Sequence, residues 1–95
     1  MPIYIALTNL SAEGRNAVRE DPAKVMTNKR ALESVGVKVL AQYATLGQYD
    51  FVNIFEADND DAIFRAAVHL TGRGVAQVQT LVAKTIDDFV ATTKK

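Results

Sequence analysis

Tyr49 and Asp50 are the residues of this chain best suited to chemistry, a phenol and a carboxylate directly before an apolar run. A carboxylate near a phenol can accept its hydrogen bond, and burial can raise the carboxylate pKa towards the range in which it transfers protons. Tyr43 precedes this pair and Asn53 follows it. We therefore predict that Tyr43, Tyr49, Asp50 and Asn53 lie near a ligand-binding site.

The same residues also suit a purely structural turn. Gly47 can adopt the positive φ that a turn between two strands requires. Asp50 would then hydrogen-bond the turn backbone or Thr45, and the tyrosines would pack against the sheet. An Asp beside a turn commonly has this role. The structural interpretation of Asp50 is therefore the more frequent of the two.

Other polar residues have simple alternatives to a functional role. His69 is the single histidine; it could ligate haem, but its helical position places it at the boundary of the apolar stripe, as in a surface residue. Lys29 could bind an anion, although its stem can pack while its ammonium reaches water. Residues 72–74 are predicted to be a helix stop rather than a phosphate loop. Gln77 and Gln79 share one strand face and would bind a ligand only if that face lines a cavity.

Composition limits the possible classes of function. The 95 residues form one domain over 1–95, and they are 48% hydrophobic with eleven basic and eleven acidic side chains. This neutral balance argues against a nucleic-acid partner. The absence of cysteine removes thiolate chemistry, and neither a catalytic triad nor a set of metal ligands can be assembled. We therefore expect no metal and no cofactor. We also expect a cytoplasmic location, because the N-terminus is unlike a signal peptide and no apolar run could span a membrane.

Hydrophobic periodicity and turn residues predict the order of the elements. The predicted elements are a strand over 2–8, a helix-prone segment over 11–20, a helix restarted by Asp21 and Pro22 and ended by Gly36, strands over 37–45 and 49–57, a helix from a cap at Asp58 to Gly72, a strand over 74–82, and a short C-terminal helix from Thr85 to about Ala91.

The turn between the two central strands sets which side chains share a face. A three-residue loop over 46–48 would place Lys38 opposite Glu56 and gather four aromatic residues on one face, whereas a two-residue loop would reverse that parity. The four are Tyr43, Tyr49, Phe51 and Phe55. The charge pair and the aromatic cluster favour the three-residue loop.

The order βαββαβ predicts a ferredoxin-like α+β sandwich, with a four-stranded antiparallel sheet and two helices on one face. We expect Tyr43, Phe51 and Phe55, with Asn53 among them, on the other face, which is then too apolar to face water. A second subunit that stacks its sheet on this face would give an assembly of the dimeric α/β-barrel type. RNA-recognition domains share the element order, but their pattern of aromatic and basic residues is missing here.

An ordered set of short motifs covers most of the chain. The motifs are Met1-Pro2-Ile3-Tyr4-Ile5, Ser11-Ala12-Glu13-Gly14, the proline-led helix from Pro22 to Gly36, Tyr43-Ala44-Thr45-Leu46-Gly47, Gly47-Gln48-Tyr49-Asp50, Glu56 and Gly74. Together they resemble the GYD-domain family of small bacterial proteins. The resemblance implies a ferredoxin-like relative of the α/β-barrel proteins with no assigned substrate.

Three functions remain open for such a domain. The first is a small-molecule binding or sensing module that forms a homodimer or a higher homo-oligomer. The second is a cofactor-independent monooxygenase or isomerase, in which Asp50 or a tyrosine moves a proton. The third is an assembly protein without a ligand. We expect no nucleic acid and no membrane among its partners, and the sequence leaves open whether the chain is an enzyme.

Overall fold

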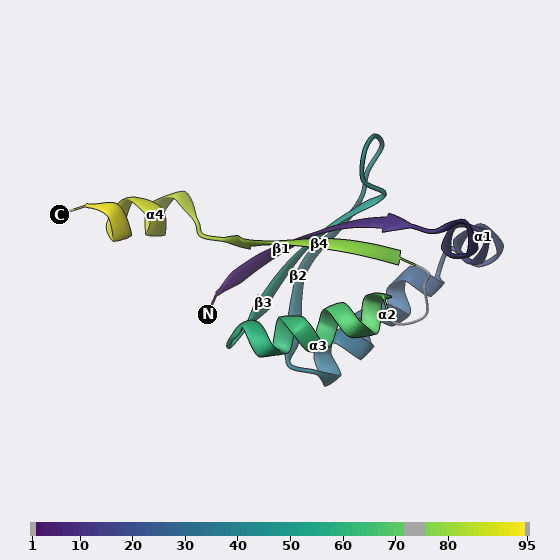
Figure 1. Ribbon diagram of the computed structural model, residues 1–95, viewed down its shortest axis with the longest axis horizontal. Coiled ribbons are helices and arrows are strands. Elements are labelled where there is room, and N and C mark those ends of the chain that lie inside the picture. The colour runs from purple at the N-terminus through teal and green to yellow at the C-terminus, as the bar shows by residue number, and fades with distance from the viewer. Residues whose placement is uncertain (1, 72–75, 95) are drawn as a thin grey trace.

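A computed structural model describes residues 2–71 and 76–94 of the chain, without the side chains of residues 24–28. It contains four strands and four helices (Figure 1). In chain order they are β1 (Ile3–Leu10), α1 (Ala12–Glu20), α2 (Lys24–Ser34), β2 (Val37–Ala44), β3 (Phe51–Ala57), α3 (Asp60–Thr71), β4 (Ala76–Ala83) and α4 (Ile86–Thr93).

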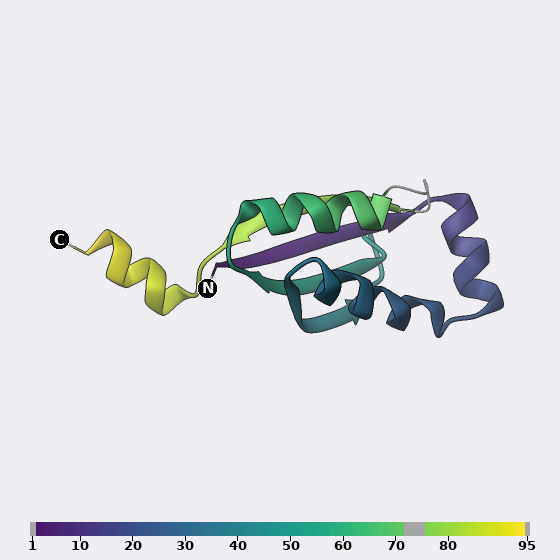
Figure 2. The ribbon, with the colours of Figure 1, turned by 90° about the horizontal axis from the view of Figure 1, so that it is seen from below.

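The strands form one antiparallel sheet in the order β2-β3-β1-β4. Helices α2 and α3 lie side by side against one face of this sheet, while α1 and α4 lie at its opposite ends (Figures 1 and 2). The predicted ferredoxin-like α+β fold is therefore confirmed. The predicted strand start at residue 74 and helix stop at Gly72 lie outside the described residues.

The core lies between the sheet and the two helices. Alternate residues of β1 point into it, because successive strand side chains face opposite sides of the sheet. Small residues on β3 and α3 allow the helix to approach the sheet closely. The buried apolar residues are Tyr4, Ala6, Leu32, Val37, Phe55, Ala57, Ala62 and Ala66.

The predicted three-residue loop is wrong. Ala44 pairs with Phe51, and the Thr45 N–H donates to the Asp50 carbonyl at 2.8 Å, so four residues remain in the loop. Lys38 nevertheless lies opposite Glu56 as predicted, because the register shifts between Val39 and Ala41. One extra residue in β2 restores the parity that the longer loop had changed.

The predicted composition of the uncovered sheet face is also wrong. Phe51, Asn53 and Phe55 were expected there, but they belong to the helix-covered face, where Phe55 is 2% and Asn53 9% exposed. Tyr43 pairs with Val52 instead of Phe51, so it alone of the four expected residues belongs to the uncovered face. Both faces of β3 are apolar in sequence, and periodicity alone therefore gave no preference between them.

We call the uncovered side of the sheet the open face. The register places alternate residues of each strand on it. Its apolar members include Ile3, Ile5, Leu7, Val52, Ile54 and Leu81. An apolar open face was predicted correctly, although a different set of residues forms it.

The start of α3 differs by one residue from the prediction. Asn59, and not Asp58, accepts the Ala62 N–H through its side-chain oxygen at 3.2 Å. Asp60 and Asp61 follow in the first turn as expected, where the helix dipole favours negative charge.

The start of α2 is less regular than the sequence predicts. The Asp21 carboxylate accepts the Ala23 N–H at 3.2 Å, as an N-cap residue would. The helix nevertheless begins only at Lys24, and residues 22 and 23 form a turn.

Helix α4 begins as predicted and ends two residues later, at Thr93. The Thr85 hydroxyl accepts the Asp88 N–H at 3.1 Å, which confirms the predicted cap. None of its residues is buried, and the helix projects beyond the end of the sheet (Figure 1). Within the described residues, every helix is too short or too polar to cross a lipid bilayer.

Candidate functional site

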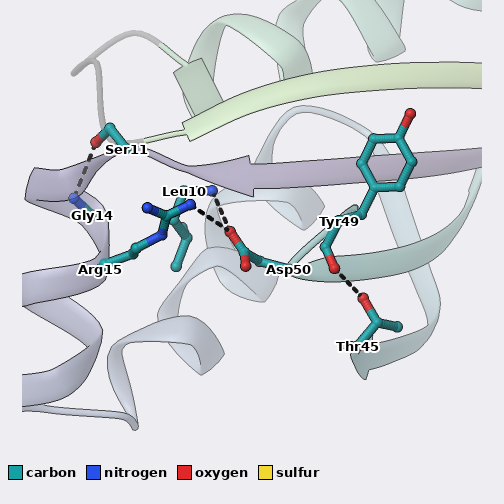
Figure 3. Close-up of polar contacts among 7 residues, drawn as sticks. All are labelled: Leu10, Ser11, Gly14, Arg15, Thr45, Tyr49 and Asp50. Carbon is teal, nitrogen blue, oxygen red and sulfur yellow. Dashed lines mark hydrogen bonds and ion pairs between the residues drawn. The ribbon is translucent and has the colours of Figure 1, made fainter. Parts of the chain in front are cut away.

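Asp50 joins the β2–β3 hairpin to the end of β1. Its N–H donates to the Thr8 carbonyl at 2.9 Å, and its carboxylate accepts the Leu10 N–H at 2.8 Å. The Arg15 guanidinium lies 3.9 Å from the same carboxylate. Figure 3 shows the two contacts of the carboxylate, with Leu10 and Arg15, where β1 passes into α1. Asp50 therefore ties the hairpin to the β1–α1 junction, about 40 positions earlier in the chain.

The local sequence explains why β1 stops at this point. The Ser11 hydroxyl accepts the Gly14 N–H at 3.1 Å and so begins α1 directly after the strand. At this turn the Leu10 N–H donates to the Asp50 carboxylate. It also brings Arg15 to the same carboxylate.

The two contacts of the Asp50 carboxylate differ in strength. The bond from the Leu10 N–H is partly buried, and a hydrogen bond to an ionised group contributes about 1.5–3 kcal/mol. The Arg15 side chain is 65% exposed and that of Asp50 33% exposed, so solvent weakens their ion pair to at most about 1 kcal/mol. The backbone hydrogen bond therefore dominates.

Asp50 thus has a structural role, but with a partner that differs from the predicted one. The Thr45 hydroxyl donates to the Tyr49 carbonyl at 2.6 Å and leaves the Asp50 carboxylate free to reach β1. Gly47 adopts a φ of +117°, so the predicted positive φ is confirmed. A Cβ at Gly47 would have no atom within 4 Å. Backbone conformation, rather than space, therefore favours glycine at this position.

Tyr49 reaches across the open face. Its hydroxyl donates to the side-chain oxygen of Gln79 at 2.8 Å, and Gln79 pairs with Leu7 on β1. The phenol of Tyr49 and the carboxylate of Asp50 point in different directions (Figure 3). A direct phenol–carboxylate pair, the chemistry suggested by their adjacency, does not form between these two residues.

The four predicted site residues do not share one surface. Tyr43 belongs to the open face and is 58% exposed, and Tyr49 lies over the same face through its bond to Gln79. Asp50 faces the end of β1, and Asn53 lies in the helix-covered layer. The structure therefore groups the two tyrosines with Gln79 and separates them from Asp50 and Asn53.

A phenol–carboxylate pair occurs elsewhere, between Tyr4 and Asp60. The buried Tyr4 hydroxyl donates to the carboxylate at the first residue of α3. This hydrogen bond raises the pKa of Tyr4, and burial and the Asp60 charge raise it further. Sequence reasoning missed the pair because 56 positions separate its members. Two features of the sequence pointed to the pair. Tyr4 lies at an inward-facing position of its strand, and Asp60 lies in the first turn of the helix.

Two surface hollows exclude the four predicted site residues, although Gln77 lines the first of them. One, of about 510 Å³, is open to solvent between the ends of β1, α3 and β4. The other, of about 380 Å³, lies where α2 meets β2. Neither includes Tyr43, Tyr49, Asp50 or Asn53. His69 and Lys29 are both exposed.

Comparison with known proteins gives the chain a family. A protein of Thermus thermophilus named glutamine synthetase and cystathionine beta-lyase binding protein is 39% identical over 95 residues, which cover 99% of this chain and 100% of the relative.

Two solved structures share the fold at low sequence identity. The 5-chloro-2-hydroxyhydroquinone dehydrochlorinase from Burkholderia phenoliruptrix, in complex with 2,5-dihydroxybenzoquinone, has a TM-score of 0.66 and 13% identity over 90% of this chain and 97% of its own. FFRP-DM1 has a TM-score of 0.58 and 20% identity over 88% and 100%. The model of the GYD domain matches residues 4–92. The chain therefore belongs to the GYD-domain family, as its motifs indicate.

Proposed function

We propose that this protein is a homodimeric binding module for other proteins, in which two copies pack their open faces together. The observation that carries the proposal is the apolar open face itself. Ile5 and Ile54 pair at its centre, and Leu81 follows on the edge strand. A continuous apolar surface of this kind on a small protein commonly marks an interface.

The size of the open face suits a symmetric dimer. Strands of seven or eight residues rise about 3.3 Å per residue and lie about 4.8 Å apart, so the face covers on the order of 500 Å². Stable interfaces bury about 800 Å² per partner. The open face would therefore supply the centre of such an interface, and its surroundings the remainder.

Dimerisation through the open face would leave the outer surface of α3 available to other proteins. Phe64 and Val68 lie one turn apart on this helix and are 72% and 68% exposed. Large aromatic residues that remain exposed are frequent anchors of protein interfaces. We assign the binding of enzymes to this ridge, which we call the α3 ridge.

The relative's name supplies the class of partner. A full-length relative at 39% identity is named as a binding protein for glutamine synthetase and cystathionine beta-lyase. We extend this class to the present chain and infer that it binds one or both enzymes. The two large exposed side chains of the α3 ridge would supply the apolar part of that contact.

Binding of the purified enzymes to the immobilised protein tests this function directly. We expect saturable binding of at least one enzyme, and a loss of tenfold or more in affinity for Phe64→Ser or Val68→Ser. Val82→Ser is the matched control, because Val82 is 75% exposed but lies on β4. Absence of binding to both enzymes by the unmodified protein would overturn the proposal.

A single charge on the open face tests the dimer separately. Ile54→Lys should convert the dimer to a monomer, because an ammonium group would be buried without a partner. Phe64→Lys is its matched control and should remain a dimer. If Ile54→Lys leaves the mass unchanged and the protein stays folded, the open face is not the interface.

The hydrogen bond between Tyr49 and Gln79 favours a small-molecule site as a second candidate function. It places a phenol and an amide at an apolar face, and a second sheet stacked there would enclose both groups beside Tyr43. Asp50 is an unsuitable proton carrier for such a site, since it already accepts the Leu10 N–H. Native mass spectrometry of freshly purified protein should then detect a retained molecule, which Tyr49→Phe would weaken.

A further inference from the structure

Helix α4 carries an apolar stripe that its own chain leaves uncovered. Ile86, Phe89 and Val90 are 75%, 54% and 51% exposed. Their spacing of three and four residues places them on one side of the helix. The hydrogen bonds of α4 among the described residues are local, such as that from Lys84 to Thr92.

An eight-residue helix of this kind needs external support. Isolated helices shorter than about 12–15 residues are marginal in water. The Thr85 cap stabilises the first turn by about 1 kcal/mol, while two of the last three residues of the helix are threonines, which have low helix propensity. The helix is therefore stabilised by packing when its stripe meets an apolar surface outside its own subunit.

A second exposed apolar element lies at the other end of the sheet. Leu46, in the β2–β3 turn, is 103% exposed, and Tyr43 beside it is 58% exposed. The turn rises on the side opposite α2 and α3 (Figure 1), the same side on which Tyr49 reaches Gln79. Leu10 and Ala76 also lie at this end, whereas α4 follows Ala83 at the far end.

We propose that α4 docks on the β2–β3 turn of a second copy of this chain, so that two such contacts lock the dimer. This inference rests on the dimer through the open face proposed above. When two open faces stack, a two-fold axis that lies between the sheets and runs across the strands exchanges the two ends of the sheet. It therefore carries the partner's turn towards α4 and the partner's α4 towards the turn, as an isologous interface requires.

Two observations favour a second copy over an unrelated partner. The first is continuity: only Lys84 and Thr85 separate α4 from β4, which contributes Leu81 to the open face. The second is area. The open face of about 500 Å² falls short of the roughly 800 Å² per partner in a standard interface. The α4 stripe and the turn lie at its two ends and supply apolar surface for the difference.

Engineered disulfides test this contact cleanly, because the chain has no cysteine. The double variant Leu46→Cys/Phe89→Cys should oxidise to a covalent dimer on a non-reducing gel. An internal bond is excluded by the length of the sheet, since seven residues of β3 alone span about 20 Å. Each single variant, and the control pair Phe64→Cys/Phe89→Cys, should remain largely monomeric on the same gel.

The outcomes separate this inference from the proposed dimer. A non-covalent dimer in solution without the 46–89 crosslink would overturn the α4 contact and leave the open-face interface standing. A ladder of larger covalent species would show head-to-tail contacts and exclude the two-fold arrangement. A protein that is monomeric in solution would overturn both.

A second variant measures the strength of the contact. Phe89→Ser should raise the dimer dissociation constant about tenfold or more, whereas Thr92→Ser, on the same helix, should leave it within about twofold. The free monomer should fold equally well in both variants, because no residue of α4 is buried in its own subunit. An unchanged dissociation constant for Phe89→Ser would contradict the proposal.

Discussion

Replacing Asp50 with alanine should destabilise the fold by about 2 kcal/mol. The change leaves the partly buried Leu10 N–H without its acceptor at 2.8 Å, and an unsatisfied buried donor costs about 1–3 kcal/mol. The ion pair with Arg15 adds little, because the Arg15 side chain is 65% exposed. For a domain of this size, a loss of 2 kcal/mol lowers Tm by about 8–16 °C.

Urea unfolding followed by circular dichroism gives the free energy of each variant at one protein concentration. Asp50→Asn retains an acceptor oxygen and should lose only about half as much stability as Asp50→Ala. Arg15→Ala should lose less than about 1 kcal/mol, and the double variant should show a small coupling energy. An Asp50→Ala protein as stable as the unmodified chain would refute the structural role of this carboxylate.

Three further changes test separate parts of the fold. Gly47→Ala should lower the unfolding free energy by about 1–2 kcal/mol in urea titration, because its φ of +117° disfavours any side chain; an unchanged midpoint would show that the turn adapts. Asn59→Ala should cost about 1 kcal/mol through loss of the bond to the Ala62 N–H, and thermal unfolding that matches the unmodified protein would contradict this cap. Tyr4 has a pKa raised above 10.0 by its bond to Asp60, so folding favours the protonated phenol. The contribution of the protonated Tyr4 to stability is complete below pH 10 and is lost as pH rises through the higher folded pKa. Tyr4→Phe should therefore lose less stability at alkaline pH in urea titrations. Parallel pH profiles for the variant and the unmodified protein would exclude this contribution of Tyr4.

The sequence predicts the element order and the sheet well, because turn residues and periodicity are local signals. Gly47 marks the hairpin turn and Thr85 marks the start of α4. No turn residue near Leu40 signals the bulge in β2. This bulge displaced the predicted register near the turn and placed Tyr43 on the face opposite to Phe51 and Phe55.

The candidate site was less predictable, because its contacts depend on tertiary structure. The adjacency of Tyr49 and Asp50 suggested one site, yet neighbouring residues beside a strand face different sides. Their partners, Gln79 and Leu10, are 30 and 40 positions away. Only the sheet order brings β4 and β1 within reach of the turn.

Sedimentation equilibrium of the unmodified protein at micromolar concentration shows whether two copies associate in solution. We expect a single species with twice the 10.4 kDa mass of the chain, formed through the open face. A species of 10.4 kDa that stays monomeric as the concentration rises would overturn the proposed dimer, because the apolar open face and the α4 stripe would then both remain exposed to water.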